Sequence, residues 1–337
     1  PVQKYLKKRV VTQKTIDHFQ IGYAPSHWDS LKKHLIANGI SETDALEAGV
    51  LTSGNKSSTY DRFRNRIIFP IQDKNSQVIG FGGRVLGDEQ PKYLNSPETL
   101  VFQKRMALFG LPQFLSHKGK IEKIMLVEGY MDVVRMHQAG LPYSLAALGT
   151  ATSSDHIRLM MRLSHQIIIC FDSDKAGRKA AWRFLELCLP FINDQVEFRF
   201  LFLPEQSDPD SYIQDEGVEA FTLQEKDSTS CLDFIFQQVG EGLNPSSLDD
   251  RVQMLSRTLP LAADLKQGFF RDVLVQKLAE ITQIDVERIE ERIRNTPKKN
   301  QPYQGQNQQT SSGVPNYSND EPVDSDDFHY GQDHEPS

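Results

Sequence analysis

Three short apolar runs that lead toward acidic residues constrain the fold of this chain more than any other feature. The runs lie within residues 123–127, 166–171 and 197–203. Glu128 and Asp172 directly follow the first two, and helix-like patterns separate the three runs. Short aliphatic runs are typical of strands buried on both faces. Strands that alternate with helices predict an α/β fold in which helices cover a parallel sheet.

Six acidic residues fall at or just past the ends of these predicted strands. They are Glu128, Asp132, Asp172, Asp174, Asp208 and Asp210. Carboxylates packed together repel one another unless a cation bridges them, and hard divalent cations prefer carboxylate oxygens. Mg²⁺ usually takes one or two protein carboxylates and completes its shell with water and phosphate. The set therefore predicts a site where Mg²⁺ or Mn²⁺ meets a phosphate substrate, although Asp208 and Asp210 taken alone equally fit a turn.

The charge of the chain is divided between its two halves. Residues 1–127 carry 19 Lys and Arg against 11 Asp and Glu, a net charge of +8. Residues 128–296 carry 17 against 27, a net of −10, and residues 297–337 carry 2 against 7, a net of −5. A basic lobe beside an acidic sheet suits an enzyme that holds a nucleic acid and uses metal ions, and the lobe's charge alone also fits a solvated face.

Three arginines at alternate positions stand out in the basic half. Arg62, Arg64 and Arg66 lead into the apolar residues 67–70. On a single strand all three would share one face, where like charges need an anion such as nucleic-acid phosphate.

A second basic group follows the Asp172 and Asp174 pair at the start of a predicted helix. It consists of Lys175, Arg178 and Lys179. These side chains either meet the triphosphate of a bound nucleotide at the helix N-terminus or neutralise the neighbouring carboxylates, and the sequence leaves both readings open.

Two motifs give the acidic set a family resemblance. Residues 126–132 (LVEGYMD) together with 171–177 (FDSDKAG) resemble the Toprim motif pair, which primases, topoisomerases and some nucleases share. The stretches 60–70, 80–84 and 91–98 narrow the resemblance to the bacterial DnaG-type DNA primases. The resemblance extends from about Tyr5 to about Arg294.

The resemblance implies specific roles for these residues. Glu128, Asp172 and Asp174 are expected to hold two Mg²⁺ or Mn²⁺ ions, with Asp132, Asp208 and Asp210 in support. The family's basic ridge matches Arg9, Arg84, Lys92 and Lys104, which are expected to contact template or nucleotide phosphates. The implied activity is that of a nucleotidyltransferase which makes short RNA primers from ribonucleoside triphosphates on single-stranded DNA during replication.

The sequence divides into four expected regions. Residues 1–119 form a basic α+β lobe, 120–215 a Rossmann-like Toprim sheet, 216–296 a helical bundle, and 297–337 a polar, disordered tether. In the family such a tether leads to a helicase-binding domain. We expect this chain to lack that domain, so that contact with the replicative helicase would require the missing part. We also expect a monomer, with single-strand binding protein as a further candidate partner.

Composition bears on location and on zinc. The three cysteines have no C-x-x-C spacing, which argues against disulfides and a zinc site in this chain and favours a reducing cytoplasm. Zinc is expected only in a module upstream of Pro1, and no apolar run is long enough to predict a membrane span. His156 follows Ser153, a predicted helix cap, and is expected at the surface.

Two other functions fit the same residues. A metal-dependent Toprim nuclease would use the acidic set but has no need for Arg84, Lys92 and Lys104. A scaffold that binds DNA and helicase without catalysis would have no saturable metal site.

Overall fold

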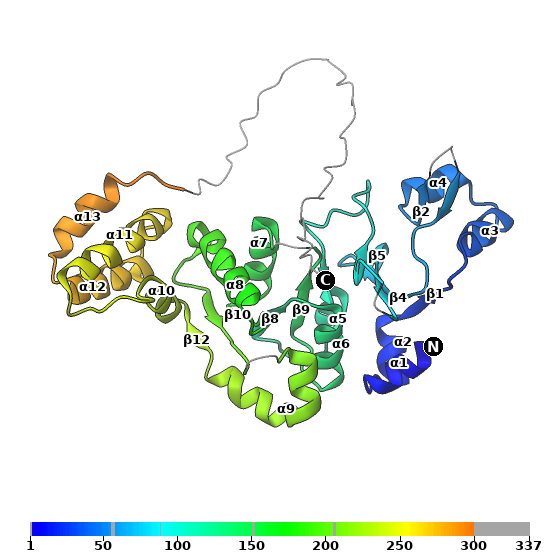
Figure 1. Cartoon of the computed structure of the whole chain (residues 1–337), viewed down its shortest axis with the longest axis horizontal. Helices are drawn as coiled ribbons and strands as arrows, with labels where there is room; N and C mark the ends of the chain where they lie inside the picture. Colours follow the sequence, from blue (N-terminus) through cyan, green and yellow to red (C-terminus); the bar gives the residue numbers. More distant parts are fainter. Residues whose placement is uncertain (1, 55–57, 88, 150–151, 205–206, 300–337) are drawn as a thin grey trace, which may run out of the picture. The chain divides into compact units, whose positions relative to one another are not determined.

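The computed structural model describes residues 2–54, 58–87, 89–149, 152–204 and 207–299 (Figure 1). All of these lie in the first compact unit of the chain, Pro1–Gln301. The expected tether from residue 300 onward falls outside the described residues.

The N-terminal lobe combines short helices with an antiparallel sheet. Its helices are α1 (Val2–Lys8), α2 (Gln13–Phe19), α3 (Ser30–Ala37) and α4 (Glu42–Glu47). Its strands are β1 (Gly22–Ala24), β2 (Leu51–Ser53), β3 (Thr59–Asp61), β4 (Arg66–Gln72), β5 (Val78–Val85) and β6 (Tyr93–Asn95). Strands β1, β4, β5 and β6 form one antiparallel sheet in that order, and β2 pairs with β3.

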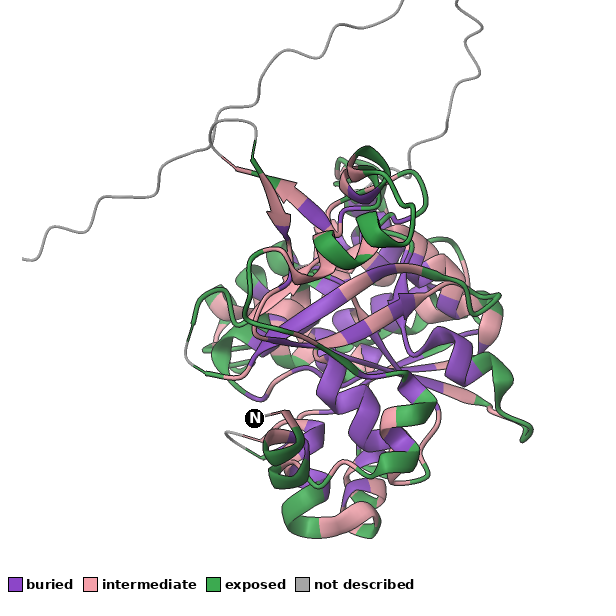
Figure 2. Cartoon of the chain, turned by 90° about the vertical axis from the view of Figure 1, so that its right-hand side faces the viewer, coloured by how far each residue is buried: buried purple, intermediate pink, exposed green. Residues whose placement is uncertain are grey.

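A second sheet of six strands follows and confirms the predicted α/β architecture. Its strands are β7 (Leu108–Phe109), β8 (Lys123–Val127), β9 (Ser144–Ala147), β10 (Gln166–Ile169), β11 (Glu197–Phe200) and β12 (Thr229–Ser230). The order is β12-β11-β10-β8-β9-β7. The four inner strands are parallel and the two edge strands are antiparallel to their neighbours. Figure 2 shows that buried residues gather along the strands and on the helices packed against them.

Helices cover this sheet because each parallel connection must cross over one of its faces. The parallel connections are α6 (Tyr130–Gln138), α7 (Ser154–Leu163) and α8 (Lys175–Cys188), which continues into the 3₁₀ turn η2 (Leu189–Phe191). Two further helices, α5 (Leu111–Ser116) and α9 (Pro209–Lys226), belong to the same region. The inner strands bury apolar side chains on both faces, as the uninterrupted run Ile124 to Val127 predicted.

The remaining described residues form a helical bundle. Its members are α10 (Cys231–Val239), α11 (Leu248–Asp264), α12 (Phe269–Thr282) and α13 (Val286–Arg294). Leu274, Leu278 and Ile289 are fully buried between these helices, as helical spacing of apolar residues predicts. Within the described ranges, no helix has the length and apolar character needed to cross a membrane.

The prediction of a surface position for His156 was wrong. The side chain is 1% exposed. Its Nδ1 accepts from the backbone N–H of Ser153, and its Nε2 donates to the carbonyls of Lys104 and Ala107. Burial lowers the pKa of His156, so a neutral imidazole joins the start of α7 to the loop before β7.

Candidate active site

The sheet brings the first two acidic residues together. Strands β8 and β10 are parallel neighbours, and the last pair in their register is Leu126 opposite Ile169. Glu128 and Asp172 therefore emerge together at the carboxyl ends of the parallel strands, which we call the acidic edge of the sheet. There the backbone N–H of Asp172 donates to Glu128 Oε1 at 3.1 Å. Burial and then the charge of Asp172 raise the pKa of Glu128, while burial and then the charge of Asp208 raise the pKa of Asp172.

Asp174 lies beside this pair at the start of α8. It caps the helix by accepting from the backbone N–H of Gly177 at 2.8 Å, and its charge contributes to the raised pKa of both Glu128 and Asp172. Gly177 packs directly against Asp172. A Cβ at position 177 would lie 2.0 Å from the carbonyl oxygen of Asp172, so only glycine fits this turn.

Asp132 and Asp208 stand next to the same edge from α6 and α9. Asp132 is 6% exposed and accepts from the backbone N–H groups of Gly129 at 2.9 Å and Asp210 at 3.2 Å. Burial and then the charge of Asp208 raise the pKa of Asp132 well above its ordinary value. Asp208 caps α9 through the backbone N–H of Ser211 at 2.7 Å.

Asp210 has partners that the sequence did not predict. Its Oδ2 accepts from Arg9 Nη1 at 2.5 Å and its Oδ1 accepts from Arg135 Nε at 2.8 Å. The carboxylate is thus neutralised by two guanidinium groups rather than left open toward the other acids.

The donor set of this edge fits a hard divalent cation. Among the residues that the structure describes, no three His, Cys, Asp or Glu side chains are grouped as metal ligands. Mg²⁺ needs only one or two carboxylates when water and phosphate supply its other ligands. Glu128 and Asp172 meet that need, and a cation between them would relieve the repulsion that raises the pKa of Glu128.

Of the expected basic ridge, Lys92 lies within electrostatic reach of this edge, whereas Arg84 is buried among aromatic rings of the N-terminal lobe. Lys92 is exposed and its charge lowers the pKa of Asp172, so its ammonium group lies within electrostatic reach of the carboxylate. The guanidinium of Arg84 lies 4.6 Å from the ring centre of Tyr5 and donates from Nε to the hydroxyl of Tyr93 at 3.1 Å. Lys104 lies beside α7, where its carbonyl accepts from His156.

The prediction that three arginines share one face of a strand was wrong. Only Arg66 belongs to β4, because the chain bends through residues 62–65 before the strand begins. Arg66 is buried and donates to the carbonyl of Gly83 at 3.2 Å, and Arg62 donates to the carbonyl of Asn95 at 3.0 Å. These two guanidinium groups therefore form hydrogen bonds within the N-terminal lobe.

Arg64 instead belongs to an aromatic cluster that sequence reasoning missed. Its guanidinium lies 4.0 Å from the ring centre of Trp28 and 4.9 Å from that of Tyr60. The Trp28 side chain is 61% exposed, so its ring is accessible at the surface of the lobe. The three residues are up to 36 positions apart, so no local pattern connects them. The signal in the sequence was a tryptophan that lies outside any apolar pattern.

The basic residues after Asp174 occupy the first turns of α8. Lys175 and Lys179 are exposed, and the Arg178 guanidinium lies 4.7 Å from the ring centre of Phe202. Their contact with a nucleotide triphosphate stays a prediction.

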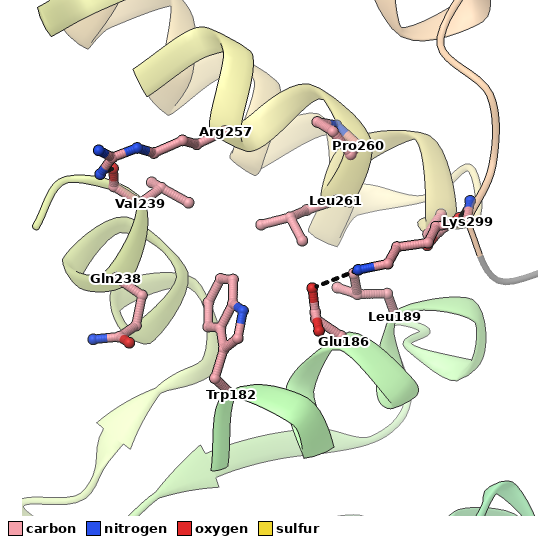
Figure 3. A pocket seen from close by; sticks show the side chains of 10 residues that line it. Trp182, Glu186, Leu189, Gln238, Val239, Arg257, Pro260, Leu261 and Lys299 are labelled. Carbon is pink, nitrogen blue, oxygen red and sulfur yellow. Dashed lines mark hydrogen bonds and ion pairs between the residues drawn. The ribbon is translucent and has the colours of Figure 1, made fainter. Parts of the chain in front are cut away.

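Two cavities adjoin α8. One of about 410 Å³ opens beside Glu128 and is also lined by Thr152 and Arg183. The other, of about 360 Å³, lies toward the far end of the helix against α10 and α11 (Figure 3). Trp182 and Leu261 line it, with none of the six acidic residues in its wall.

Comparison with known proteins assigns the chain to a family. Residues 1–115 match the model of the DNA primase catalytic core N-terminal domain, and residues 125–213 match the Toprim-like model. A solved structure of the DnaG primase catalytic domain bound to single-stranded DNA is 40% identical, with a TM-score of 0.80 over 85% of this chain and 90% of that one. The chain belongs to the DnaG-type DNA primase family.

Further relatives agree with this assignment. A DNA primase domain from Pseudomonas aeruginosa is 42% identical with a TM-score of 0.83, covering 86% of this chain and 91% of that one. The DNA primases of Pseudomonas putida and Escherichia coli K12 are 42% and 41% identical over 87% and 82% of this chain. The chain spans only 45% and 48% of these two relatives, about half their length.

The family comparison also corrects one prediction. Residues 232–287 match the model of the DnaB-helicase binding domain of primase. The chain therefore does carry a segment of helicase-binding type, contrary to the expectation that it lacks one. Helical spacing of apolar residues predicts only a bundle here, because this spacing describes packing and carries no information about partners.

Proposed function

We propose that this chain is the catalytic core of a DNA primase, which joins ribonucleotides into short RNA primers on single-stranded DNA. The observation that carries the proposal is the shared sheet edge of Glu128 and Asp172, in a chain of this family. The reaction needs a 3′-hydroxyl activated for attack and a pyrophosphate leaving group stabilised. A carboxylate edge faced by Lys92 provides ligands for cations and a positive charge for phosphate.

The metal ions belong to this proposal. Glu128 and Asp172 would hold Mg²⁺ or Mn²⁺, with Asp174, Asp132 and Asp208 around them. When bound, such ions lower the pKa of an attacking hydroxyl and neutralise the leaving phosphate oxygens. Asp210 is not among the ligands in this proposal, because both of its oxygens accept from guanidinium groups.

The template would approach along the N-terminal lobe. Lys92 and Arg84 would take backbone phosphates near the acidic edge, as expected of the basic ridge. The Arg64 cluster with Trp28 and Tyr60 adds an exposed aromatic surface, and such surfaces bind single strands by stacking on bases. A solved relative is bound to single-stranded DNA, which supports a single-stranded template for this chain.

We further propose that the bundle contacts a replicative helicase and that the protein works in the cytoplasm. Support comes from the match of residues 232–287 and from Cys170, Cys188 and Cys231, which are all buried as free thiols.

Primer synthesis by an Asp172→Asn variant tests the activity and the site together. Labelled ribonucleotides would be supplied with a single-stranded template and Mg²⁺ or Mn²⁺. We expect RNA products from the wild type and from the control Asp249→Asn, an exposed carboxylate on α11, and none from Asp172→Asn. The variant should retain its affinity for the template.

The alternatives give different results in the same assay. Degradation of the template without synthesis would assign the chain to the Toprim nucleases. No reaction, together with no saturable Mn²⁺ binding in a calorimetric titration, would favour a non-catalytic scaffold. Undiminished synthesis by Asp172→Asn would refute the assignment of the site.

A further inference from the structure

Asp210 is a buried carboxylate held between two arginines from distant parts of the chain. The residue is 1% exposed. Arg135, on α6, has a side chain that is 7% exposed and contacts Oδ1, while Arg9, just after α1, has a side chain that is 34% exposed and contacts Oδ2. A buried carboxylate needs such partners because it has lost its hydration.

These contacts tie three helices together. Arg135 also donates from Nη2 to the backbone carbonyl of Arg9 and, at 3.1 Å, to Gln214 Oε1 on α9. The end of α1, the middle of α6 and the first two turns of α9 are thus joined through one guanidinium and one carboxylate.

The same group continues into the acidic edge through hydrogen bonds. The backbone N–H of Asp210 donates to Asp132 Oδ1 at 3.2 Å. The other oxygen of Asp132 accepts at 2.9 Å from the N–H of Gly129, the residue after Glu128. Glu128 in turn accepts from the N–H of Asp172. An unbroken series of contacts therefore leads from Arg9 to both carboxylates of the shared edge.

We propose that Arg9, Arg135 and Asp210 form a positioning group, the Asp210 bridge, that holds Asp132 and the Glu128 loop in place for metal binding. The inference deepens the proposed function and rests on it. The family resemblance implied that Arg9 contacts the template and that Asp210 supports metal binding. The Asp210 bridge gives both residues a positioning role instead. A cation at Asp210 would have to displace two guanidinium groups from a site that is almost closed to water.

Arg9→Gln is the central test, because Arg9 is the more exposed of the two arginines and its loss leaves Arg135 on Asp210. We expect Mn²⁺ affinity, measured by calorimetry without nucleotide, to fall about 10- to 100-fold, the usual effect of losing a group that orients metal ligands. Affinity for single-stranded DNA, measured by fluorescence anisotropy without metal, should change less than about twofold. Lys8→Gln, which removes the same charge one residue away, should leave Mn²⁺ affinity unchanged. Arg9→Lys, which keeps the charge, should recover most of it.

A double variant separates the bridge from direct metal binding by Asp210. If the residues act as one group, Arg9→Gln combined with Asp210→Asn should weaken Mn²⁺ binding no more than the worse single variant. Additive losses would overturn the bridge and return Asp210 to the metal ligands. Weakened DNA binding by Arg9→Gln with unchanged Mn²⁺ affinity would overturn it too and make Arg9 a template residue. Absence of Mn²⁺ binding by the wild type would instead refute the proposed function.

Discussion

Gly177→Ala probes the junction between α8 and the acidic edge with a single methyl group. The glycine lies in the first turn of α8, and a Cβ there would lie 2.0, 2.7 and 2.9 Å from the carbonyl oxygen, carbonyl carbon and nitrogen of Asp172. All three are backbone atoms, so no side-chain rotation relieves the contact. The added carbon can be accommodated only if the start of α8 and the backbone of Asp172 move apart.

The magnitude follows from that distance. To lengthen from 2.0 Å to 3.0 Å, the shortest separation that Cβ atoms tolerate, the contact requires a movement of about 1 Å. Overpacking of this kind costs roughly 1–3 kcal/mol of stability, whereas replacing glycine by alanine within a helix would by itself gain about 1 kcal/mol. A displacement of about 1 Å in a catalytic group lowers turnover about 100-fold. We therefore expect a modest loss of stability and a large loss of primer synthesis.

Urea denaturation and primer synthesis at saturating nucleotide would measure the two effects. Gly22→Ala is the matched control, because the nearest atom to its added Cβ is the Cβ of Ile68 at 4.0 Å. That variant should keep wild-type synthesis. A Gly177→Ala protein that is more stable than the wild type and synthesises primers normally would refute the reasoning. Such a result would show that alanine stabilises the helix and that its Cβ does not clash with the backbone of Asp172.

Three further predictions concern the template, the metal edge and pH. Trp28→Ala and Arg64→Ala should each lower the affinity for single-stranded DNA about tenfold in fluorescence anisotropy, since stacking on one base is worth roughly 1–3 kcal/mol; unchanged affinity would exclude the cluster from the template route. Without divalent cations, Asp172→Asn should melt at a higher temperature than the wild type in calorimetry, because it removes a charge that adds to burial in raising the pKa of Glu128, and a lower melting temperature would contradict this repulsion. Burial lowers the pKa of His137 from 6.5 to about 4, so on acidification the unfolded chain takes up the proton before the folded chain does. The free energy of unfolding should therefore fall by up to about 3 kcal/mol as pH drops through that interval. His137→Gln should flatten this decline in urea titrations at several pH values, and an equally steep decline in the variant would refute the role of His137.

Local sequence patterns accounted for the sheet and for its acidic edge. The runs before Glu128 and Asp172 predicted buried parallel strands, because continuous aliphatic stretches can be stable only where both faces are covered. Parallel strands end at a common edge, so the two carboxylates had to meet once the strands paired. The caps by Asp174 and Ser153 were equally local, since each accepts from an N–H three residues ahead.

The partners of the long-range side chains were decided only by the tertiary structure. Asp210 had the same spacing as a metal ligand, yet its carboxylate pairs with Arg9, 201 residues away. Arg64 fitted a strand pattern with its neighbours, yet the chain bends there and its guanidinium stacks on Trp28. The sequence by itself determined which elements form and which carboxylates share an edge, because hydrophobic period and capping act over a few residues. The pairing of charged side chains depends on how elements far apart in the chain pack together, and local hydrophobic periodicity carries no information about that packing.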